Sequence, residues 1–130
     1  MTQTDGPLAR QIALRGRTRD FAIATVRLCE TFPRTMAARH IASQLLRSST
    51  SVAANYRAAC RSRSRKEFTA KVGVVLEEAD ESLFWLEFGR HLDLFPRDRG
   101  DMVVSEADEL VAIFTATRST LLKRLRMKPT

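Results

Sequence analysis

The stretch that decides the fold lies near the middle of the 130-residue chain, where residues 64–86 read SRKEFTAKVGVVLEEADESLFWL. Ser64 followed three residues later by Glu67 is a capping box, in which each side chain can satisfy a free backbone N–H of the first helical turn. The apolar side chains that follow recur at three- and four-residue steps, the spacing of an amphipathic helix. We therefore expect a helix from near residue 65 to about Leu94, before the Phe95-Pro96 pair breaks it. Its core face is expected to contain Phe68, Val72, Val75, Ala79, Ser82 and Leu86.

Three other segments show the same helical spacing. It predicts a helix over about residues 18–32, which Pro33 ends because a proline disfavours helix at the residue before it. Another is expected over about residues 36–60, where alanine and leucine favour helix. The last is expected over about residues 102–126, with Asp101 or Ser105 as its cap. The helix that starts near residue 65 is expected to be the longest.

The order of these segments predicts the topology. The sequence shows neither sustained period-2 alternation nor a tight hairpin turn, so nothing in it indicates a β-sheet. Short connections make consecutive amphipathic helices antiparallel neighbours. We therefore predict an all-α protein, an antiparallel up-down-up-down four-helix bundle over residues 17–126. Residues 1–16 are expected to form a flexible N-terminal tail, and residues 127–130 a C-terminal tail.

Composition indicates the compartment. Residues 1–17 have no long apolar run behind a basic start and so do not resemble a signal peptide. The longest apolar stretches, such as residues 72–76, are far shorter than the roughly 20 residues that a membrane-spanning helix requires. Cys29 and Cys60 fall within helical patterns, which is typical of reduced, partly buried thiols. We expect a cytoplasmic protein with no membrane partner.

Charge is distributed unevenly along the chain. Residues 1–66 contain thirteen Lys or Arg against three Asp or Glu, whereas residues 67–130 contain nine against twelve. A chain with one basic and one acidic half can attract phosphate backbones, or it can pair the two halves within or between subunits. Both interpretations remain open at this point.

A basic cluster surrounds the expected turn before Glu67. Phosphate groups could bind there both to guanidinium groups and to the positive N-terminus of the following helix. Arginines near residues 15–19 and cations near residues 123–128 could extend this surface. The cluster has none of the aromatic interleaving that single-strand binders use to stack bases. The predicted nucleic-acid-binding residues are Arg57, Arg61, Arg63, Arg65 and Lys66.

An additional apolar face is expected on the helix that begins near residue 65. Residues placed at 100° intervals bring Phe84, Trp85, Phe88 and Leu92 together, on the side opposite the core stripe. Four large apolar groups on an outward face would make an unusually large exposed patch for a monomer. We predict that they form an oligomer interface.

A polar line runs along the segment 36–60, beside its apolar stripe. Ser48, Ser51 and Asn55 recur at three- and four-residue steps, and such groups are tolerated near a core only when they are hydrogen-bonded. No histidine or paired carboxylate accompanies them, so the base that a nucleophile needs is missing. We predict a structural role for this line. Arg47 beside it could pair with Glu78 or Glu81, within a subunit or between subunits.

Catalytic and metal-binding patterns are weak. His40 and His91 lie far apart in the sequence, with no H-x-x-x-H or C-x-x-C spacing. The acidic residues of the segment 77–87 include no Glu-x-x-His pair of the kind that binds two iron ions in helical bundles. We therefore expect a protein that is not an enzyme and that has no metal or cofactor.

The polar line belongs to a longer pattern. Residues 44–56 read QLLRSSTSVAANY, followed by SRKEF at 64–68 and EEADES at 77–82. This pattern resembles the four-helix-bundle proteins encoded in intervening sequences of large-subunit ribosomal RNA genes. That family also includes the accessory variability determinants of diversity-generating retroelements.

The resemblance carries its own expectations. It implies an antiparallel bundle that assembles as a homopentamer, often with a basic surface. In the retroelement branch it also implies binding to nucleic acid and to a reverse transcriptase. Many members continue the asparagine with a Glu-Gly pair, whereas Asn55 is followed here by Tyr56 and Arg57, which removes an acid and adds a base at the basic turn.

Two functions follow from these observations. The first is a homo-oligomeric, pentameric bundle that binds RNA, DNA or a ribonucleoprotein partner through its basic surface. The second is a protein-interaction scaffold in which the uneven charge serves only the pairing of subunits. Loss of binding at increasing salt would distinguish them, because counterions compete with phosphate contacts.

Overall fold

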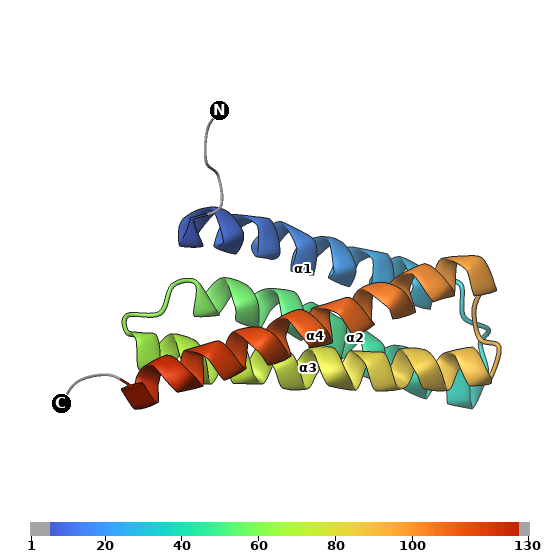
Figure 1. Ribbon diagram of the computed structural model, residues 1–130. Helices are drawn as coiled ribbons and strands as arrows, with labels where there is room; N and C mark the ends of the chain where they lie inside the picture. Colours follow the sequence, from blue (N-terminus) through green and yellow to red (C-terminus); the bar gives the residue numbers. More distant parts are fainter. Residues whose placement is uncertain (1–5, 128–130) are drawn as a thin grey trace.

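The computed structural model describes residues 6–127, which form four α-helices and no strand. The helices are α1 (Pro7–Cys29), α2 (Met36–Ala59), α3 (Arg65–His91) and α4 (Arg97–Met127). Consecutive helices run in opposite directions and are joined by short connections (Figure 1). The predicted all-α, antiparallel four-helix bundle is confirmed.

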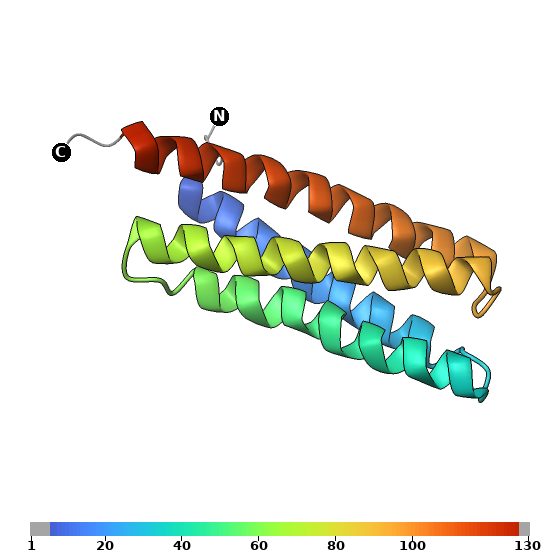
Figure 2. The ribbon, with the colours of Figure 1, turned by 90° about the horizontal axis from the view of Figure 1, so that it is seen from below.

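The helices form a square in cross-section. Each helix packs against the helix before and after it in the chain, and α4 closes the square against α1, whereas the backbones of the two diagonal pairs do not approach each other closely. Figure 2 shows α4, α3 and α2 side by side, with α1 crossing behind them. The contact between α1 and α4 is the loosest of the four, and the two helices separate toward the start of α1 (Figure 1).

Two helices begin earlier than the sequence analysis predicts. α1 begins at Pro7 rather than near residue 18, so residues 7–16 are helical and not part of a flexible tail. Proline suits the first position of a helix, because its φ is already helical and its missing N–H would be unpaired there anyway. Of the rest of the two predicted tails, Gly6 is the N-cap of α1 and Met127 is the last residue of α4, whereas residues 1–5 and 128–130 lie outside the described residues.

α4 begins at Arg97 rather than near residue 102, so Asp101 and Ser105 lie inside the helix and are not its cap. With 31 residues α4, and not α3 with 27, is the longest helix among the described residues. Gly100 lies in its first turn and is buried, where the ring of Phe95 packs directly over it. Glycine usually interrupts a helix, but at this position the missing side chain leaves room for the ring of Phe95.

Side-chain caps fix the starts of the two central helices. The Ser64 hydroxyl accepts a hydrogen bond from the Glu67 N–H at 3.0 Å, as the capping box predicts. The Glu67 carboxylate accepts from the backbone N–H of Arg63 at 2.9 Å, which completes the box one residue further upstream. Thr35, which the sequence analysis did not single out, caps α2 by accepting from the Ala38 N–H at 3.2 Å.

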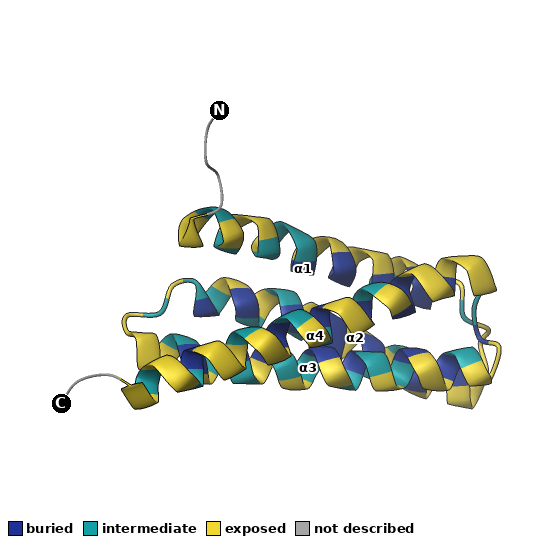
Figure 3. Ribbon diagram, in the orientation of Figure 1, coloured by how far each residue is buried: buried dark blue, intermediate teal, exposed yellow. Residues whose placement is uncertain are grey.

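The core runs along the axis of the square. Figure 3 shows buried residues on the inward sides of the helices and exposed ones on the outer sides. At its centre the rings of Tyr56 on α2 and Phe114 on α4 lie 5.3 Å apart. Five of the six side chains predicted for the core face of α3 are fully buried, and Phe68 is half-buried against the core. Among residues 6–127, no helix is long and apolar enough to cross a membrane.

Candidate nucleic-acid interface

The predicted basic cluster lies exposed around the α2–α3 turn. Arg57 belongs to the last turn of α2, Arg61 and Arg63 to the connection, and Arg65 and Lys66 to the first turn of α3. All five side chains are exposed. The first turn of α3 presents its unpaired N–H groups in the same place, so helix geometry and side-chain charge both favour an anion there.

Two further basic segments lie at the same end of the bundle. The start of α1 and the end of α4 both point to the end that contains the α2–α3 turn (Figure 1). Lys66 lines a shallow depression together with Leu122 and Leu125 of α4, so the turn and the end of α4 are in contact. We refer to residues 7–19, 57–67 and 118–127 together as the basic end.

The basic end contains almost no acid. Its three segments hold thirteen Lys or Arg side chains and a single carboxylate, that of Glu67. The rest of the chain has nine Lys or Arg and fourteen Asp or Glu. The positive charge is therefore concentrated at one end of a bundle whose remainder is net negative. Each segment is visible in the sequence, but the fold is what brings the three of them together.

One arginine of the basic end is already occupied. The Arg17 guanidinium donates to both carboxylate oxygens of Glu106 on α4, at 2.7 and 2.9 Å, and also to Glu109 at 2.6 Å. The hydrogen bonds with Glu106 are the main cause that raises the pKa of Arg17 above its ordinary range, so this charge is permanent. Arg17 thus fastens α1 to α4 at the loosest side of the square, and it is not available to a phosphate.

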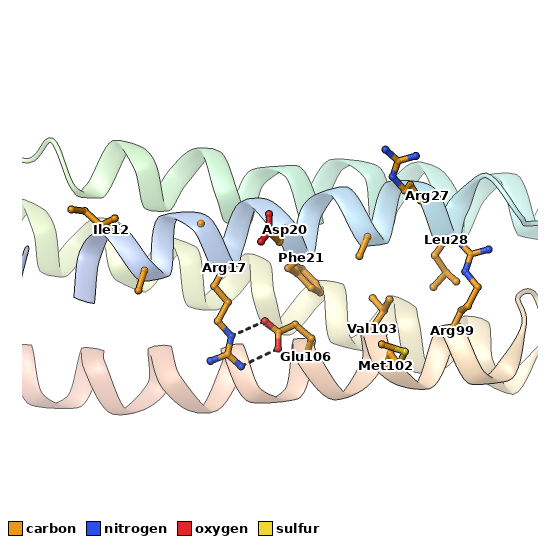
Figure 4. A pocket seen from close by; sticks show the side chains of 13 residues that line it. Ile12, Arg17, Asp20, Phe21, Arg27, Leu28, Arg99, Met102, Val103 and Glu106 are labelled. Carbon is orange, nitrogen blue, oxygen red and sulfur yellow. Dashed lines mark hydrogen bonds and ion pairs between the residues drawn. The ribbon is translucent and has the colours of Figure 1, made fainter. Parts of the chain in front are cut away.

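A groove of about 790 Å³ lies between α1 and α4 (Figure 4). Apolar side chains make up much of its lining, including Phe21 and Ala24 of α1 and Met102 and Val103 of α4. Its charged residues are mixed in sign, since Asp20 and Glu106 accompany Arg17, Arg27 and Arg99. This lining does not favour an anion.

The predicted apolar face of α3 is partly exposed. Phe84, Phe88 and Leu92 keep 52%, 44% and 46% of their surface accessible. Trp85 is half-buried and packs against the core, and its ring lies 4.9 Å from Phe84 and 6.0 Å from Phe88. The edge of His40 on α2 also contacts Trp85, at 5.6 Å, so this aromatic face lies on the α2–α3 side of the bundle.

The side chains of the polar line on α2 make hydrogen bonds inside the bundle. The Ser48 and Ser82 hydroxyls form a buried hydrogen bond of 2.9 Å between α2 and α3. The Asn55 side chain donates to the Ser51 carbonyl of its own helix at 2.9 Å. Ser49, in the same stretch, has a buried hydroxyl for which no protein partner is found.

Arg47 makes the ion pairs that the sequence suggests, and it makes them within one chain. Its guanidinium lies 3.3 Å from Glu78 and also donates to Glu81 of α3. The hydrogen bond from Arg47 is the main cause that lowers the pKa of Glu81. The Glu81 carboxylate also accepts from the indole N–H of Trp85 at 3.3 Å, so Arg47 helps to hold the aromatic face in place.

The part of the chain that the structure describes contains no group of three or more His, Cys, Asp or Glu side chains that could hold a metal ion. Both cysteines are free thiols, and burial raises the pKa of Cys29 to about 12, so that this thiol stays protonated at neutral pH. A protonated thiol is a poor nucleophile.

Comparison with known proteins supports the resemblance drawn from residues 44–56. The crystal structure of a protein with unknown function from the S23 ribosomal protein family, from Bacteroides thetaiotaomicron, matches this fold with a TM-score of 0.73. The two sequences are 26% identical, and the match covers 80% of this chain and 96% of that one. No curated protein matches the sequence.

A family model described as 23S rRNA-intervening sequence protein matches residues 10–116. This range includes all of α2 and α3 and most of α1 and α4. The chain therefore belongs to the family of 23S rRNA-intervening sequence proteins.

Proposed function

We propose that this protein is a non-catalytic, homo-oligomeric bundle that binds nucleic acid, or a ribonucleoprotein partner, through its basic end. One observation carries the proposal: thirteen cationic side chains and one carboxylate are collected at a single end of the molecule. A charge imbalance of this size attracts phosphate backbones over a distance of about a Debye length, roughly 8 Å at physiological salt. The description of the family, which refers to 23S rRNA, supports RNA as the first ligand to test.

The charge is available for such contacts. The cations around the α2–α3 turn are exposed, and none of the ion pairs found among the described residues involves Arg57, Arg61, Arg63, Arg65 or Lys66. Phosphate contacts position a nucleic acid without reading its sequence. The expected binding is therefore electrostatic, dependent on salt and weakly selective for sequence.

Self-association is supported by two apolar surfaces. The exposed part of the aromatic face lies on the α2–α3 side, and the groove between α1 and α4 lies on the opposite side of the square. Two different surfaces on opposite sides favour head-to-tail contacts, which close into a ring when the rotation between subunits allows it. A pentamer, as the family resemblance implies, is one such ring. It would place several basic ends in one assembly.

The same aromatic face favours the second candidate, a scaffold that binds only proteins. A protein partner such as a reverse transcriptase, which the family resemblance implies for one branch, could use it in place of another subunit. In that case the basic end would serve assembly, and removing its charge would change the mass of the particle.

A salt titration tests the proposal. Binding of labelled single-stranded RNA, single-stranded DNA and duplex DNA would be followed by fluorescence anisotropy from 25 to about 300 mM salt, and the particle mass by light scattering. We expect log K to fall linearly with log salt concentration. The combined variant Arg57→Gln, Arg61→Gln, Arg63→Gln and Arg65→Gln should remain folded and lose affinity. The absence of any binding at low salt would contradict a nucleic-acid role, and dissociation of the oligomer by this variant would favour the scaffold.

A further inference from the structure

A second groove, of about 680 Å³, runs along the other side of α1, where α1 faces α2. Its banks carry three arginines, Arg15 and Arg19 from α1 and Arg57 from α2. Small side chains such as Ala53 and Ala54 keep the space between the banks open. No carboxylate lines this groove, in contrast to the groove between α1 and α4.

These arginines are free to bind an anion. All three are exposed, and the one ion pair among them joins Arg19 to its neighbour Asp20 at 3.3 Å, with both side chains about two-thirds exposed. An exposed pair of this kind contributes at most about 1 kcal/mol and is easily exchanged for a phosphate.

We propose that this groove holds the sugar–phosphate backbone of a single-stranded nucleic acid, with phosphates bound by Arg15 and Arg19 on one bank and by Arg57 on the other. This inference rests on the proposed function and locates the binding site for nucleic acid between α1 and α2. Arginine suits the role because its planar fork donates two parallel hydrogen bonds to one phosphate.

Three features favour a single strand. The groove is bounded by only two helices, α1 and α2, so one strand can lie along it, whereas a duplex could touch only its rims. Arg15 and Arg19 are four residues apart on one helix, about 6 Å along its axis, so they can contact successive phosphates. Arg57 lies in the last turn of α2, so that the groove leads directly to Arg61 and the basic turn.

The lining of the groove also predicts how selective the binding is for base sequence. No aromatic residue lines the groove, so there is no platform on which a base could stack. Binding should therefore depend on phosphate and show little preference for base sequence. Bases would point away from the floor, toward solvent.

The test compares two triple variants of the full chain that have the same net charge. The groove variant is Arg15→Gln, Arg19→Gln and Arg57→Gln. The control variant is Arg34→Gln, Arg39→Gln and Arg97→Gln, which removes three exposed arginines at the opposite end of the bundle. The probes are a 20-nucleotide mixed-sequence RNA, the same sequence as DNA, and the corresponding DNA duplex.

We expect the groove variant to bind the single strands at least tenfold more weakly, and the control to bind them within about twofold of the natural chain. The salt slope of the groove variant should be shallower by about two units, because three contacts contribute about 0.7 each for a single strand. A steric variant, Ala54→Phe, should also weaken single-strand binding without changing charge. Its control is Ala112→Phe, at an exposed position of α4 outside the groove.

The outcomes distinguish a failure of the groove as the binding site from a failure of the proposed nucleic-acid function. Equal losses of affinity in the groove variant and the control variant would show that net charge alone determines binding. They would overturn the proposal that the groove is the binding site. A loss only when Arg61, Arg63 and Arg65 are replaced would place the strand at the turn, and the nucleic-acid function would stand. Unchanged affinity in Ala54→Phe, or tighter binding of the duplex, would overturn the single-strand site. If the natural chain binds none of the probes at 25 mM salt, the proposed function itself fails. Circular dichroism and light scattering on every variant verify the fold and the assembly.

Discussion

The hydroxyls of Ser48 on α2 and Ser82 on α3 lie 2.9 Å apart in a fully buried position. The Ser82 hydroxyl is also 2.9 Å from the carbonyl of Glu78 in its own helix, so it has two partners, whereas Ser48 has a partner only in Ser82. A buried hydroxyl group that is left unpaired retains its full desolvation cost. This pair therefore ties two core helices together in one register.

The asymmetry of this pair predicts unequal effects of two alanine substitutions. Ser82→Ala should lower the free energy of unfolding by about 1–3 kcal/mol, because it leaves the Ser48 hydroxyl buried and unpaired. Ser48→Ala should cost less, because Ser82 keeps the Glu78 carbonyl. The double variant should cost less than the sum of the two single ones. Urea unfolding followed by circular dichroism measures all three, and a larger loss in Ser48→Ala than in Ser82→Ala would contradict the arrangement.

Two helical glycines should respond to alanine in opposite ways. A Cβ added at Gly100 would lie 2.0 Å from Cε1 of Phe95, so Gly100→Ala must displace a ring that also stacks on Phe32. We expect a loss of about 1–3 kcal/mol, as for other overpacked sites. A Cβ at Gly73 would meet only the flexible Arg118 side chain, at 3.2 Å. Gly73→Ala should therefore gain about 0.5–1 kcal/mol from helix propensity.

Thermal unfolding distinguishes these cases. The melting temperature should fall for Gly100→Ala and rise for Gly73→Ala. Adding Phe95→Leu to Gly100→Ala should recover part of the loss, since the smaller side chain leaves room for the new methyl group. Equal changes in both glycine variants would indicate that propensity, and not the Phe95 contact, sets the stability of the first turn of α4.

The sequence is sufficient to predict what depends on local chemistry. The helix type and the start of α3 at its capping box follow from spacing over a few residues. The Arg47 ion pairs are different, because they join side chains 31 and 34 residues apart on two helices. The early start of α4 does not follow so easily, because packing overrides the bias against helix at Gly100. The start of α1 depends on a local signal instead, since proline suits the first position of a helix. At Gly100 the decisive contact is with Phe95, which covers the glycine only after the chain has turned into α4.

At the candidate interface, too, some features follow from local sequence and others depend on the fold. Each basic segment is visible in the sequence, but their concentration at one end depends on the antiparallel order of four helices. Sequence also cannot distinguish Arg17, which binds Glu106 far along the chain, from Arg15 and Arg19, which do not. Grooves on either side of α1 arise from the divergence of packed helices, and no local pattern encodes them.

The chain's one tryptophan should report the titration of Glu81. The Arg47 hydrogen bond lowers the pKa of Glu81 below its ordinary value of 4.5, and the carboxylate accepts from the Trp85 indole. A lowered folded-state pKa means that the stabilisation is complete above pH 4.5 and is lost as the pH falls through the folded-state pKa. Trp85 emission should therefore change only in more acidic solution.

Arg47→Gln removes the main cause of the lowered pKa and should move the midpoint of this change to higher pH. Arg39→Gln, an exposed arginine of the same helix, should leave the midpoint in place. Glu81→Gln should abolish the transition. The measurements use a His40→Gln background, because the His40 ring contacts Trp85 and would also affect its emission. A midpoint that does not respond to Arg47→Gln would show that the pair does not persist in solution.

The aromatic face offers a test of assembly. Trp85 packs against the core, so its substitution would disturb the fold as well, whereas Phe88 is 44% exposed and can be changed with less risk. Phe88→Glu should reduce the particle mass measured by light scattering while circular dichroism remains helical. Val74→Glu, at an exposed apolar residue elsewhere on α3, should leave the mass unchanged. An unchanged mass for Phe88→Glu would mean that the aromatic face does not hold the subunits together.

The geometry of the two apolar surfaces makes this test more specific. If the aromatic face of one subunit enters the groove between α1 and α4 of the next, then Met102→Glu, in the groove, should dissociate the assembly just as Phe88→Glu does. Each variant then keeps the surface that the other has lost. Mixing the two should therefore restore one native interface and yield a dimer that neither variant forms alone, because a head-to-tail contact needs only one intact surface from each partner. A face that paired with itself would behave differently, since Met102→Glu would then leave the assembly intact and the mixture would form no new species.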